Sequence, residues 1–406
     1  MSERIVRLSM GDTAANARLM YGRDNRESLR ELPPSSVHCC ITSPPYHGLR
    51  DYGAEGQIGL EGSPDEYVAA LVDVFREVKR VLRPDGTLWL NLGDNYAQCE
   101  FSHLVDGVTS RSYGMKEKDL VGIPWRVAFA LREDGWYFRS ACPWIKRNVM
   151  PLPLRDRPTS AVEYMFLFAH PDSKGVYYYD IDGTRTVTDA GDAGRNRRDS
   201  DWFFEGLQHT VYEAQHVLQG GETLMHSDEG EPQAFVVNPR GYTGSHFATF
   251  PHALVEPCVR AGTSAHGVCP SCGTPWSRIR VETERASGSR AVPTEGGWGR
   301  TNTHLGITVP NRKRTPISTQ WEAGCKCGGE PVPSTVLDPF SGAATVGAVA
   351  LRQNRHYIGL DVNPAFMEVA EARIMQAPPP PRAGVTPGDA RDVGGGVLDM
   401  FGGDDE

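Results

Sequence analysis

Short apolar segments alternate with segments of helical periodicity along most of this 406-residue chain, and this alternation restricts its fold more than any other feature. The apolar segment VHCCITSPPY, for example, ends in a turn signal and is followed by the helical segment PDEYVAALVDVFREVKRVL. Repeated strand–turn–helix units of this kind predict a parallel sheet that is covered by helices on both faces. We therefore expect an α/β fold with a doubly wound, mostly parallel sheet.

The segment PDEYVAALVDVFREVKRVL has the apolar periodicity of a helix with one buried face. Its apolar positions recur at three- and four-residue spacing, and they are Val68, Leu71, Val72, Phe75, Val78 and Leu82. We expect Pro84 and Gly86 to end this helix, because proline lacks an amide hydrogen and glycine favours a turn. Two further apolar segments, TLWLNLGD and SAVEYMFLFAH, are expected to form strands.

The distribution of charge says more about partners than the formal net charge of −9. Residues 377–406 carry six acidic side chains and two arginines in a Pro/Gly-rich context, and we expect them to be disordered. The segment 276–314 carries eight basic residues against three glutamates, which suits phosphate contacts, although a solvated loop explains the same composition. The sequence contains no apolar run of bilayer-spanning length, so we expect a cytoplasmic protein without a membrane partner.

A glycine-containing loop, DPFSGAATVG, follows an expected strand at 335–337 and precedes a helix that should begin near Ala344. Gly342 would let the backbone approach a ligand, and the start of the helix presents free N–H groups. A second expected strand, HYIGLD, ends in Asp361, where an acid can accept both hydroxyls of a ribose.

The same loop matches neither the G-x-G-x-x-G pattern of dinucleotide sites nor the G-K-S/T of triphosphate sites. It therefore favours a nucleoside without a phosphate chain. S-adenosylmethionine fits this description, with Asp338 near its charged amino group and Phe340 beside its adenine. A glycine loop that only serves the geometry of the sheet is the alternative.

Several segments in a fixed order resemble the β-class amino-methylating DNA methyltransferases, in which the catalytic loop precedes the cofactor loop. These segments are GRDNRESLRELPPSSVHCCITSPPY, VLRPDGTLWLNLGD, WIKRNVMPLPLRDRPTSAVEYMFLF, HFATFPHALVEPC and DPFSGAATVGAVALRQNRHYIGLDVNP. The resemblance implies an S-adenosylmethionine-dependent methyltransferase fold with one antiparallel strand, and it places the N-terminal catalytic strand beside the C-terminal cofactor strand. It also implies that Phe250 joins Phe340 around the cofactor and that Asp24 lies near the adenine. Asp24 follows Gly22 by one residue more than in the family's usual Gly-Asp pair.

The periodicity fades after about Asp180, and with the resemblance this suggests a division of the chain into six parts. They are a catalytic half (1–180), a target-recognition insertion (181–240), a cofactor-region helix (241–264), a cysteine-rich insertion (265–334), a cofactor-binding half (335–376) and the acidic tail (377–406). Arg195, Arg197, Arg198 and Trp202 are candidate recognition residues.

The candidate catalytic residues are Ser43, Pro44, Pro45 and Tyr46. An exocyclic amine is a poor nucleophile because its lone pair is delocalised into the ring, and acceptors on its NH2 group favour a tetrahedral nitrogen. Rigid prolines would aim the carbonyl of Pro44 and the hydroxyl of Ser43 at that amine, while Tyr46 would stack on a flipped base. In the resembled family serine before Pro-Pro-Tyr favours cytosine N4, whereas aspartate or asparagine favours adenine N6.

The cysteines divide into ligand candidates and core candidates. Cys269, Cys272, Cys325 and Cys327 form a C-x-x-C and a C-x-C pair, which can close a tetrahedral zinc site; free surface thiols are the alternative. Such a zinc ion would be structural, because methyl transfer from a sulfonium needs no Lewis acid. We expect Cys39, Cys40 and Cys258 to be structural core residues, although Cys258 follows proline as a ring-carbon methyltransferase would require.

These observations predict a site-specific methyltransferase that binds double-stranded DNA, and the resemblance leaves a homodimer open. Cytosine N4 is the expected target, with adenine N6 as the alternative. Methylation of RNA or of a protein glutamine is disfavoured by the motif order. An inactive, zinc-containing DNA-binding protein is disfavoured by the intact loops at Ser43 and Asp338.

Overall fold

The computed structural model describes residues 4–9, 15–97, 115–146, 156–157, 160–184, 224–226, 232–236, 251–282 and 317–376. Several sequence predictions lie outside these residues. They are the cofactor contact of Phe250, the candidate contacts at Arg195, Arg197, Arg198 and Trp202, the basic residues of 283–316, and the disorder of 377–406.

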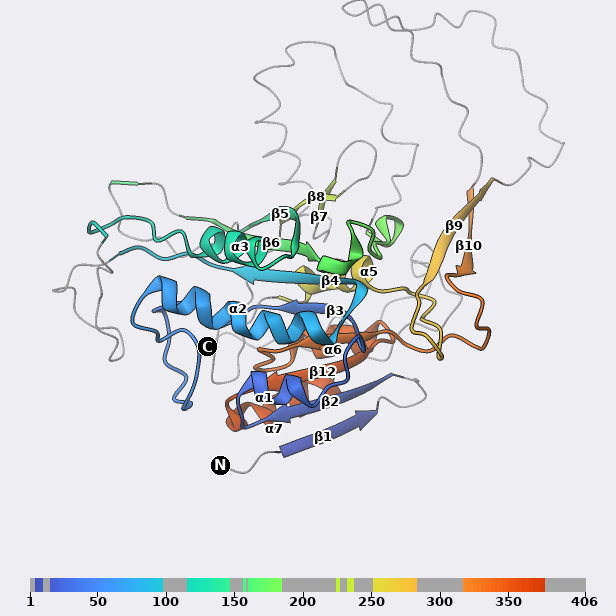
Figure 1. The fold of residues 1–406 in the computed structure, drawn as a ribbon, viewed down its shortest axis with the longest axis horizontal. Coiled ribbons are helices and arrows are strands. Elements are labelled where there is room, and N and C mark those ends of the chain that lie inside the picture. Colours follow the sequence, from blue (N-terminus) through green and yellow to red (C-terminus); the bar gives the residue numbers. More distant parts are fainter. Residues whose placement is uncertain are drawn as a thin grey trace, which may run out of the picture.

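A single ten-stranded sheet forms the centre of the described structure (Figure 1). Its strands are β1 (Arg4–Ser9), β2 (Asn16–Tyr21), β3 (Val37–Thr42), β4 (Leu82–Leu92), β5 (Tyr137–Ile145), β6 (Val162–Ala169), β7 (Leu224–His226), β8 (Pro232–Val236), β11 (Thr335–Asp338) and β12 (His356–Asp361). Their order is β1-β2-β12-β11-β3-β4-β6-β5-β8-β7. The central strands from β2 to β4 all run parallel, which confirms the expected sheet.

Helices cover both faces of the sheet, as the alternation of segments predicted (Figure 1). One face packs against α1 (Asn25–Arg30), α2 (Pro64–Val81) and α3 (Ile123–Glu133), and the other against α5 (His252–Gly262), α6 (Thr345–Arg352) and α7 (Met367–Met375). Short 3-10 turns η1 (Pro171–Ser173), η2 (Ile181–Gly183) and η3 (Pro364–Phe366) complete the connections. None of the described helices is both long and apolar enough to cross a membrane.

Strands from the N-terminal and C-terminal parts of the described chain lie side by side in the middle of the sheet. Strand β3 pairs in parallel with β11, with Cys39 opposite Val336 and Cys40 opposite Leu337. On the other side of β11, β12 pairs with β2. This arrangement confirms that the strand before Ser43 lies beside the strand that ends at Asp338.

Two details differ from the sequence prediction. Helix α2 ends at Val81, because Leu82 already has extended backbone angles, and Pro84 and Gly86 lie within β4 rather than at the end of the helix. In the pairing of β3 with β4, Val37 lies opposite Leu82 but Cys39 lies opposite Thr87. The residues between Leu82 and Thr87, which include Pro84 and Gly86, therefore lie in an irregular part of β4 that leaves the regular pairing. Strand β6 is antiparallel to both neighbours as expected, but the edge pairs β1–β2 and β7–β8 are antiparallel as well.

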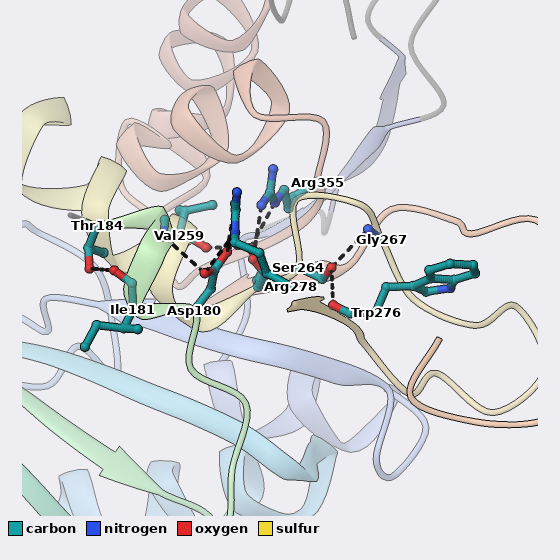
Figure 2. A network of polar contacts seen from close by, with 11 residues as sticks. Asp180, Ile181, Thr184, Val259, Ser264, Gly267, Trp276, Arg278 and Arg355 are labelled. Carbon is teal, nitrogen blue, oxygen red and sulfur yellow. Dashed lines mark hydrogen bonds and ion pairs between the residues drawn. The ribbon is translucent and has the colours of Figure 1, made fainter. Parts of the chain in front are cut away.

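The cysteine-rich insertion leaves the sheet as a separate two-stranded ribbon of β9 (Trp276–Glu282) and β10 (Ile317–Ala323). A polar network joins the base of this ribbon to the main domain (Figure 2). The Arg278 guanidinium donates to both carboxylate oxygens of Asp180, at 3.0–3.2 Å, and the buried Arg355 donates to the hydroxyl (2.9 Å) and carbonyl (3.1 Å) of Thr263. The ribbon is therefore tied to the residues that precede the 185–223 segment.

Candidate functional site

Three parallel strands bring the predicted cofactor and catalytic residues to one edge of the sheet. Thr42 ends β3, Asp338 ends β11 and Asp361 ends β12. The carboxyl ends of parallel strands share an edge, and this edge is where open α/β sheets bind their ligands. The site is therefore built from residues that lie far apart in the sequence.

Asp338 links the two loops directly. The Thr42 hydroxyl donates to Asp338 Oδ1 at 2.6 Å, and the Phe340 N–H donates to the same oxygen at 3.1 Å. Asp338 is 1% exposed, and burial raises the pKa of its carboxyl group to about 7. A buried carboxylate in this state binds a cationic group favourably, because the cation offsets the cost of ionisation.

Asp361 holds the glycine loop in place. Its Oδ2 accepts from the Gly342 N–H at 2.8 Å, and its Oδ1 accepts from the Asn363 N–H at 2.8 Å. Burial raises the pKa of Asp361 to about 6. Gly342 has φ +48°, and the position of a Cβ atom there is open space, so the backbone can be approached closely by a ligand.

Two buried tyrosines, Tyr21 and Tyr357, form hydrogen bonds to the glycine loop. The Ser341 hydroxyl lies 2.6 Å from the Tyr21 hydroxyl and 2.7 Å from that of Tyr357, and Tyr21 also donates to the Gly342 carbonyl at 2.9 Å. Gly347 allows this packing, because a Cβ atom would lie 2.5 Å from the Tyr357 ring. The glycine loop therefore rests on a rigid polar base.

The loop that follows Ser43–Tyr46, the candidate catalytic turn, contacts the segment after Asp361 at the candidate cofactor edge, which is formed by the ends of β11 and β12. The Asn363 side-chain amide donates to the Tyr52 carbonyl at 3.1 Å, and the Tyr52 and Phe366 rings meet edge to face, with centroids 6.4 Å apart. Sequence reasoning assigned no role to Tyr52, Asn363 or Phe366. Asn363 could have been identified from the segment GLDVNP, because it lies only two residues after the candidate ribose ligand Asp361.

Tyr46 of the catalytic turn is oriented through its hydroxyl group. This hydroxyl donates to Glu163 Oε2 at 2.8 Å and lies 3.0 Å from Asn91 Oδ1. Ser43 also donates to Asn91 Oδ1, at 3.3 Å, so its own oxygen keeps lone pairs that can accept a hydrogen bond. Burial and the Glu163 carboxylate raise the pKa of Tyr46 well above its usual value, so the phenol stays neutral.

Glu163 and Lys146 form an ion pair behind Tyr46. Their side chains are 15% and 18% exposed, and Lys146 also lies over the Trp144 ring, 4.3 Å from its centroid. Asn91 completes the cluster by donating to Glu163 Oε2 at 3.3 Å. These three residues lie in the segments NLGD, WIKRN and VEYMFLF, but their mutual contact depends on strand pairing that the sequence does not display.

The remaining predicted residues of the turn are also fixed. Pro44 is buried, and the Pro45 carbonyl accepts from the Tyr67 hydroxyl at 2.8 Å. A Cβ atom on Gly93 would lie 2.4 Å from Tyr46 Cε2, so glycine makes room for the ring. The turn is therefore held from three elements: α2, β4 and β6.

Asp24 is placed at the same edge but has a structural partner of its own. It caps α1, accepting from the Arg26 N–H at 2.7 Å, and its carboxylate pairs with the Arg26 guanidinium. The neighbouring Gly22 donates to the Asp361 carbonyl at 2.9 Å. The structure thus brings Ser43–Tyr46, Asp338, Phe340, Gly342 and Asp361 to one edge, with Asp24 close by as a helix cap.

The four cysteines predicted to bind metal do cluster. Their sulfur atoms lie within 4.8 Å of one another, and Cys269 is buried while Cys272 and Cys327 are exposed. Hydrogen bonds from Thr274 lower the pKa of Cys272 to about 6. Cys39, Cys40 and Cys258 are fully buried, and burial raises the pKa of each thiol, which excludes a nucleophilic role.

Comparison with known sequences gives one family. A sequence profile described as DNA methylase, of the N6/N4 methyltransferase type, matches residues 37–269 and 330–372. The matched ranges contain the catalytic turn, Asp338 and Asp361. The break between them covers most of the cysteine-rich insertion.

Similar proteins include two Type II methyltransferases. M.Cfr9I of Citrobacter freundii is 32% identical over 88% of this chain and 88% of its own length. M.XycI of Xanthomonas campestris pv. cyanopsidis is 34% identical over 87% of each chain. Among solved structures, PvuII DNA methyltransferase (cytosine-N4-specific) covers 90% of both chains at 16% identity, with a TM-score of 0.49.

Proposed function

The chain belongs to the family of DNA methylases that modify exocyclic amines, and from this premise we propose that it methylates N4 of cytosine at a specific site in double-stranded DNA. Membership of the family makes it an S-adenosylmethionine-dependent DNA methyltransferase. The observation that supports the proposed site best is the Thr42–Asp338 hydrogen bond, which joins the catalytic turn to the cofactor loop.

S-adenosylmethionine supplies a methyl group on a sulfonium, and transfer to an amine releases S-adenosylhomocysteine and one proton. The buried carboxyl groups of Asp338 and Asp361 fit this ligand, because both gain from a cationic or hydroxyl-donating partner. In the proposed arrangement Asp338 faces the amino group, Asp361 accepts from the ribose hydroxyls, and Phe340 lies beside the adenine. Gly342 gives the backbone clearance for this ligand. Phe250 is proposed to join Phe340 in enclosing the cofactor, with Asp24 near the adenine.

The catalytic turn is proposed to prepare the amine for attack. Ser43 donates its own hydrogen to Asn91, so its oxygen can accept from the NH2 group, together with the carbonyl of Pro44. Two acceptors on the NH2 group draw the nitrogen lone pair out of the ring and aim it at the methyl group. Tyr46, whose hydroxyl donates to Glu163, is proposed to stack on the face of the flipped base.

Cytosine is proposed over adenine because Ser43 precedes Pro44-Pro45-Tyr46. The test is single-molecule sequencing of DNA from a host that lacks its own methylation and expresses the enzyme, combined with mass spectrometry of the nucleosides. N4-methylcytosine in one sequence context is the expected result. N6-methyladenine would replace the base assignment and leave the family unchanged, whereas unmodified DNA from active, folded protein would refute the proposed function.

The names of the relatives, Type II methyltransferases, suggest the biological role of this enzyme. We infer that this enzyme protects cytoplasmic DNA as the modification half of a restriction–modification pair. Residues 181–240 are proposed to select the target sequence, within the six-part division expected from the sequence. A homodimer also belongs to this proposal, and sedimentation of the free enzyme tests it.

A further inference from the structure

The insertion between α5 and β11 is closed at its base by a short antiparallel bridge. The Val268 N–H donates to the Val332 carbonyl at 2.8 Å, and the Val332 N–H donates back at 2.9 Å. A Cβ atom on Gly267 would lie 2.6 Å from the Val332 carbonyl, so glycine permits the approach. We call residues 264–275 and 324–334 the neck of the insertion.

All four clustered cysteines lie in this neck, two on each side. Cys269 and Cys272 follow Val268 on the outgoing segment, and Cys325 and Cys327 precede Val332 on the returning one. A tetrahedral zinc site with Zn–S bonds of about 2.3 Å needs sulfur atoms about 3.8 Å apart. The observed separations, all within 4.8 Å, therefore need only a small contraction. A disulfide would instead require two sulfurs about 2 Å apart, and the four cysteines are free thiols.

The first pair sits on a tight turn suited to a metal ion. The Cys269 N–H donates to the Thr274 carbonyl at 2.9 Å, and the Gly273 N–H donates to the Cys269 carbonyl at 2.8 Å. Gly273 has φ +71°, and Gly328, after the second pair, has φ +76°. Both glycines thus adopt the left-handed conformation that brings closely spaced cysteines around one point.

The turn that carries these cysteines is docked on the catalytic sheet. Arg83 donates to the Cys272 carbonyl at 2.7 Å, and His38 Nε2 lies 3.1 Å from the Gly273 carbonyl. His38 Nδ1 accepts from the Thr335 N–H at 3.0 Å, so the Nε2–H is the donor to Gly273. His38 lies at the start of β3, and the catalytic turn follows the end of the same strand.

We propose that Cys269, Cys272, Cys325 and Cys327 bind one structural Zn²⁺ ion. This ion fixes the neck of the insertion to the N-terminal ends of β3 and β4, whereas the catalytic turn follows the C-terminal end of β3. Four soft thiolates favour zinc over the hard cations, which prefer oxygen ligands. The neck carries only two larger aliphatic side chains, Val268 and Val332. Its one aromatic ring, that of His266, packs against Trp276 and Trp321 of the ribbon, with centroids 4.7 and 5.5 Å apart. The ion therefore supplies the cohesion that a small apolar core cannot.

The metal content of purified protein tests this proposal. Wild type is purified without a histidine tag, under reducing conditions and without chelator, and zinc is measured by mass spectrometry beside Cys272→Ser, Cys325→Ser and the control Cys142→Ser. Wild type and Cys142→Ser should each carry about one zinc per chain, and the two ligand variants should lose most of it. Replacement by Co²⁺ should give the intense visible absorption of a tetrahedral thiolate site.

Hydrogen–deuterium exchange on wild type tests the fixing role without relying on variants that can misfold. Removal of zinc by a strong chelator should raise amide exchange at least tenfold in 264–282 and 317–334, while β6 stays protected. Zinc-free reduced wild type, unchanged zinc in both ligand variants, or iron in place of zinc would overturn the metal assignment. Equal exchange at the neck with and without zinc would overturn the fixing role.

Discussion

The ring and the hydroxyl of Tyr46 have separate proposed roles, and two substitutions distinguish them. Tyr46→Ala removes the proposed stacking surface, worth about 1–3 kcal/mol per base, so kcat/KM should fall roughly 5- to 150-fold. Tyr46→Phe keeps the ring and loses the hydrogen bond to Glu163, so a loss of about fivefold is expected, from about 1 kcal/mol. Tritiated-methyl transfer to duplex DNA measures both effects.

Calorimetric titration with S-adenosylmethionine is the control for these variants. Affinity for the cofactor should match wild type in both, because Tyr46 lies on the base side of the proposed site. A loss of cofactor binding in Tyr46→Ala would show that the cofactor and base sites are misplaced.

The two buried carboxyl groups predict a pH dependence of cofactor binding. Without ligand, Asp338 has a pKa of about 7 and Asp361 of about 6, and both are proposed to bind the cofactor in the ionised form. Lowering the pH through 7 and then 6 protonates them, so the dissociation constant should rise as the pH falls and level off above about pH 8. Titrations between pH 5.5 and 8.5 test this, and Asp338→Asn should bind weakly with a flatter profile. A wild-type affinity independent of pH would contradict the assignment.

Sequence reasoning at this scale found residues with a local signature and missed those defined by distant contacts. Asp338 and Asp361 follow recognisable strands, and Ser43–Tyr46 is a short motif, so their positions could be predicted. Glu163 and Lys146 meet at the antiparallel β5–β6 pair, whose register is set by tertiary packing. No spacing in the sequence predicts the contact between Glu163 and Lys146.

At the scale of single elements, the clearest test is Gly93, just after β4. A Cβ atom there would lie 2.4 Å from the Tyr46 ring, so Gly93→Ala must displace the ring or the strand. Overpacking of this kind costs about 1–3 kcal/mol, and methyl transfer should fall by an order of magnitude or more. A normal transfer rate in Gly93→Ala would show that the ring position seen here is not the catalytic one.

Thermal unfolding and cofactor titration separate displacement of the ring from global damage. The melting temperature of Gly93→Ala should fall by only a few degrees, and its affinity for S-adenosylmethionine should be unchanged. In the double variant Gly93→Ala/Tyr46→Ala the clash is relieved, so the second substitution should add less to the loss than it does alone.

The type of each element was easier to predict than its ends. Helix α2 carries the expected apolar stripe and begins at the capping residue Ser63, whose hydroxyl accepts from the Glu66 N–H at 3.2 Å. Its end lies earlier than Pro84 and Gly86 indicated, because Leu82 pairs with Val37 in the sheet. Pairing with a distant strand stopped the helix before its local stop signals did.

At the scale of the whole molecule, the Asp180–Arg278 pair joins the ribbon to the main domain (Figure 2). Asp180 is nearly buried, with its side chain 4% exposed, while Arg278 is 23% exposed. Arg278→Gln leaves a carboxylate without its cation, which should lower the free energy of unfolding by about 1–3 kcal/mol after allowance for solvent around Arg278. Urea unfolding measures the change.

The exposed pair Lys118–Asp156 provides the matched control, with side chains 67% and 51% exposed. Lys118→Gln should change the stability by less than about 0.5 kcal/mol, because water screens surface ion pairs. In the double variant Asp180→Asn/Arg278→Gln the two losses should be less than additive. Strict additivity would mean that the pair does not couple the ribbon to the domain.

The overall architecture was predictable because strand–helix alternation leaves few topologies, and the family resemblance fixed the order of the halves. The neighbours of the edge strands β1 and β7 were not predictable, since strands as short as these carry little periodicity. The clustering of the cysteines followed from spacing alone, but their docking on His38 and Arg83 required the fold.

The pairing of β3 with β11 has a consequence for the timing of synthesis. Thr42 and Asp338, which share a hydrogen bond, are 296 positions apart in the chain. A ribosome that adds about 5–20 residues per second needs roughly 15–60 s to make that stretch. A nascent chain therefore carries its catalytic turn long before it can hold a methyl donor, and any product truncated ahead of Thr335 would lack half of the cofactor edge. Modification of DNA therefore requires that synthesis has passed β11 and β12.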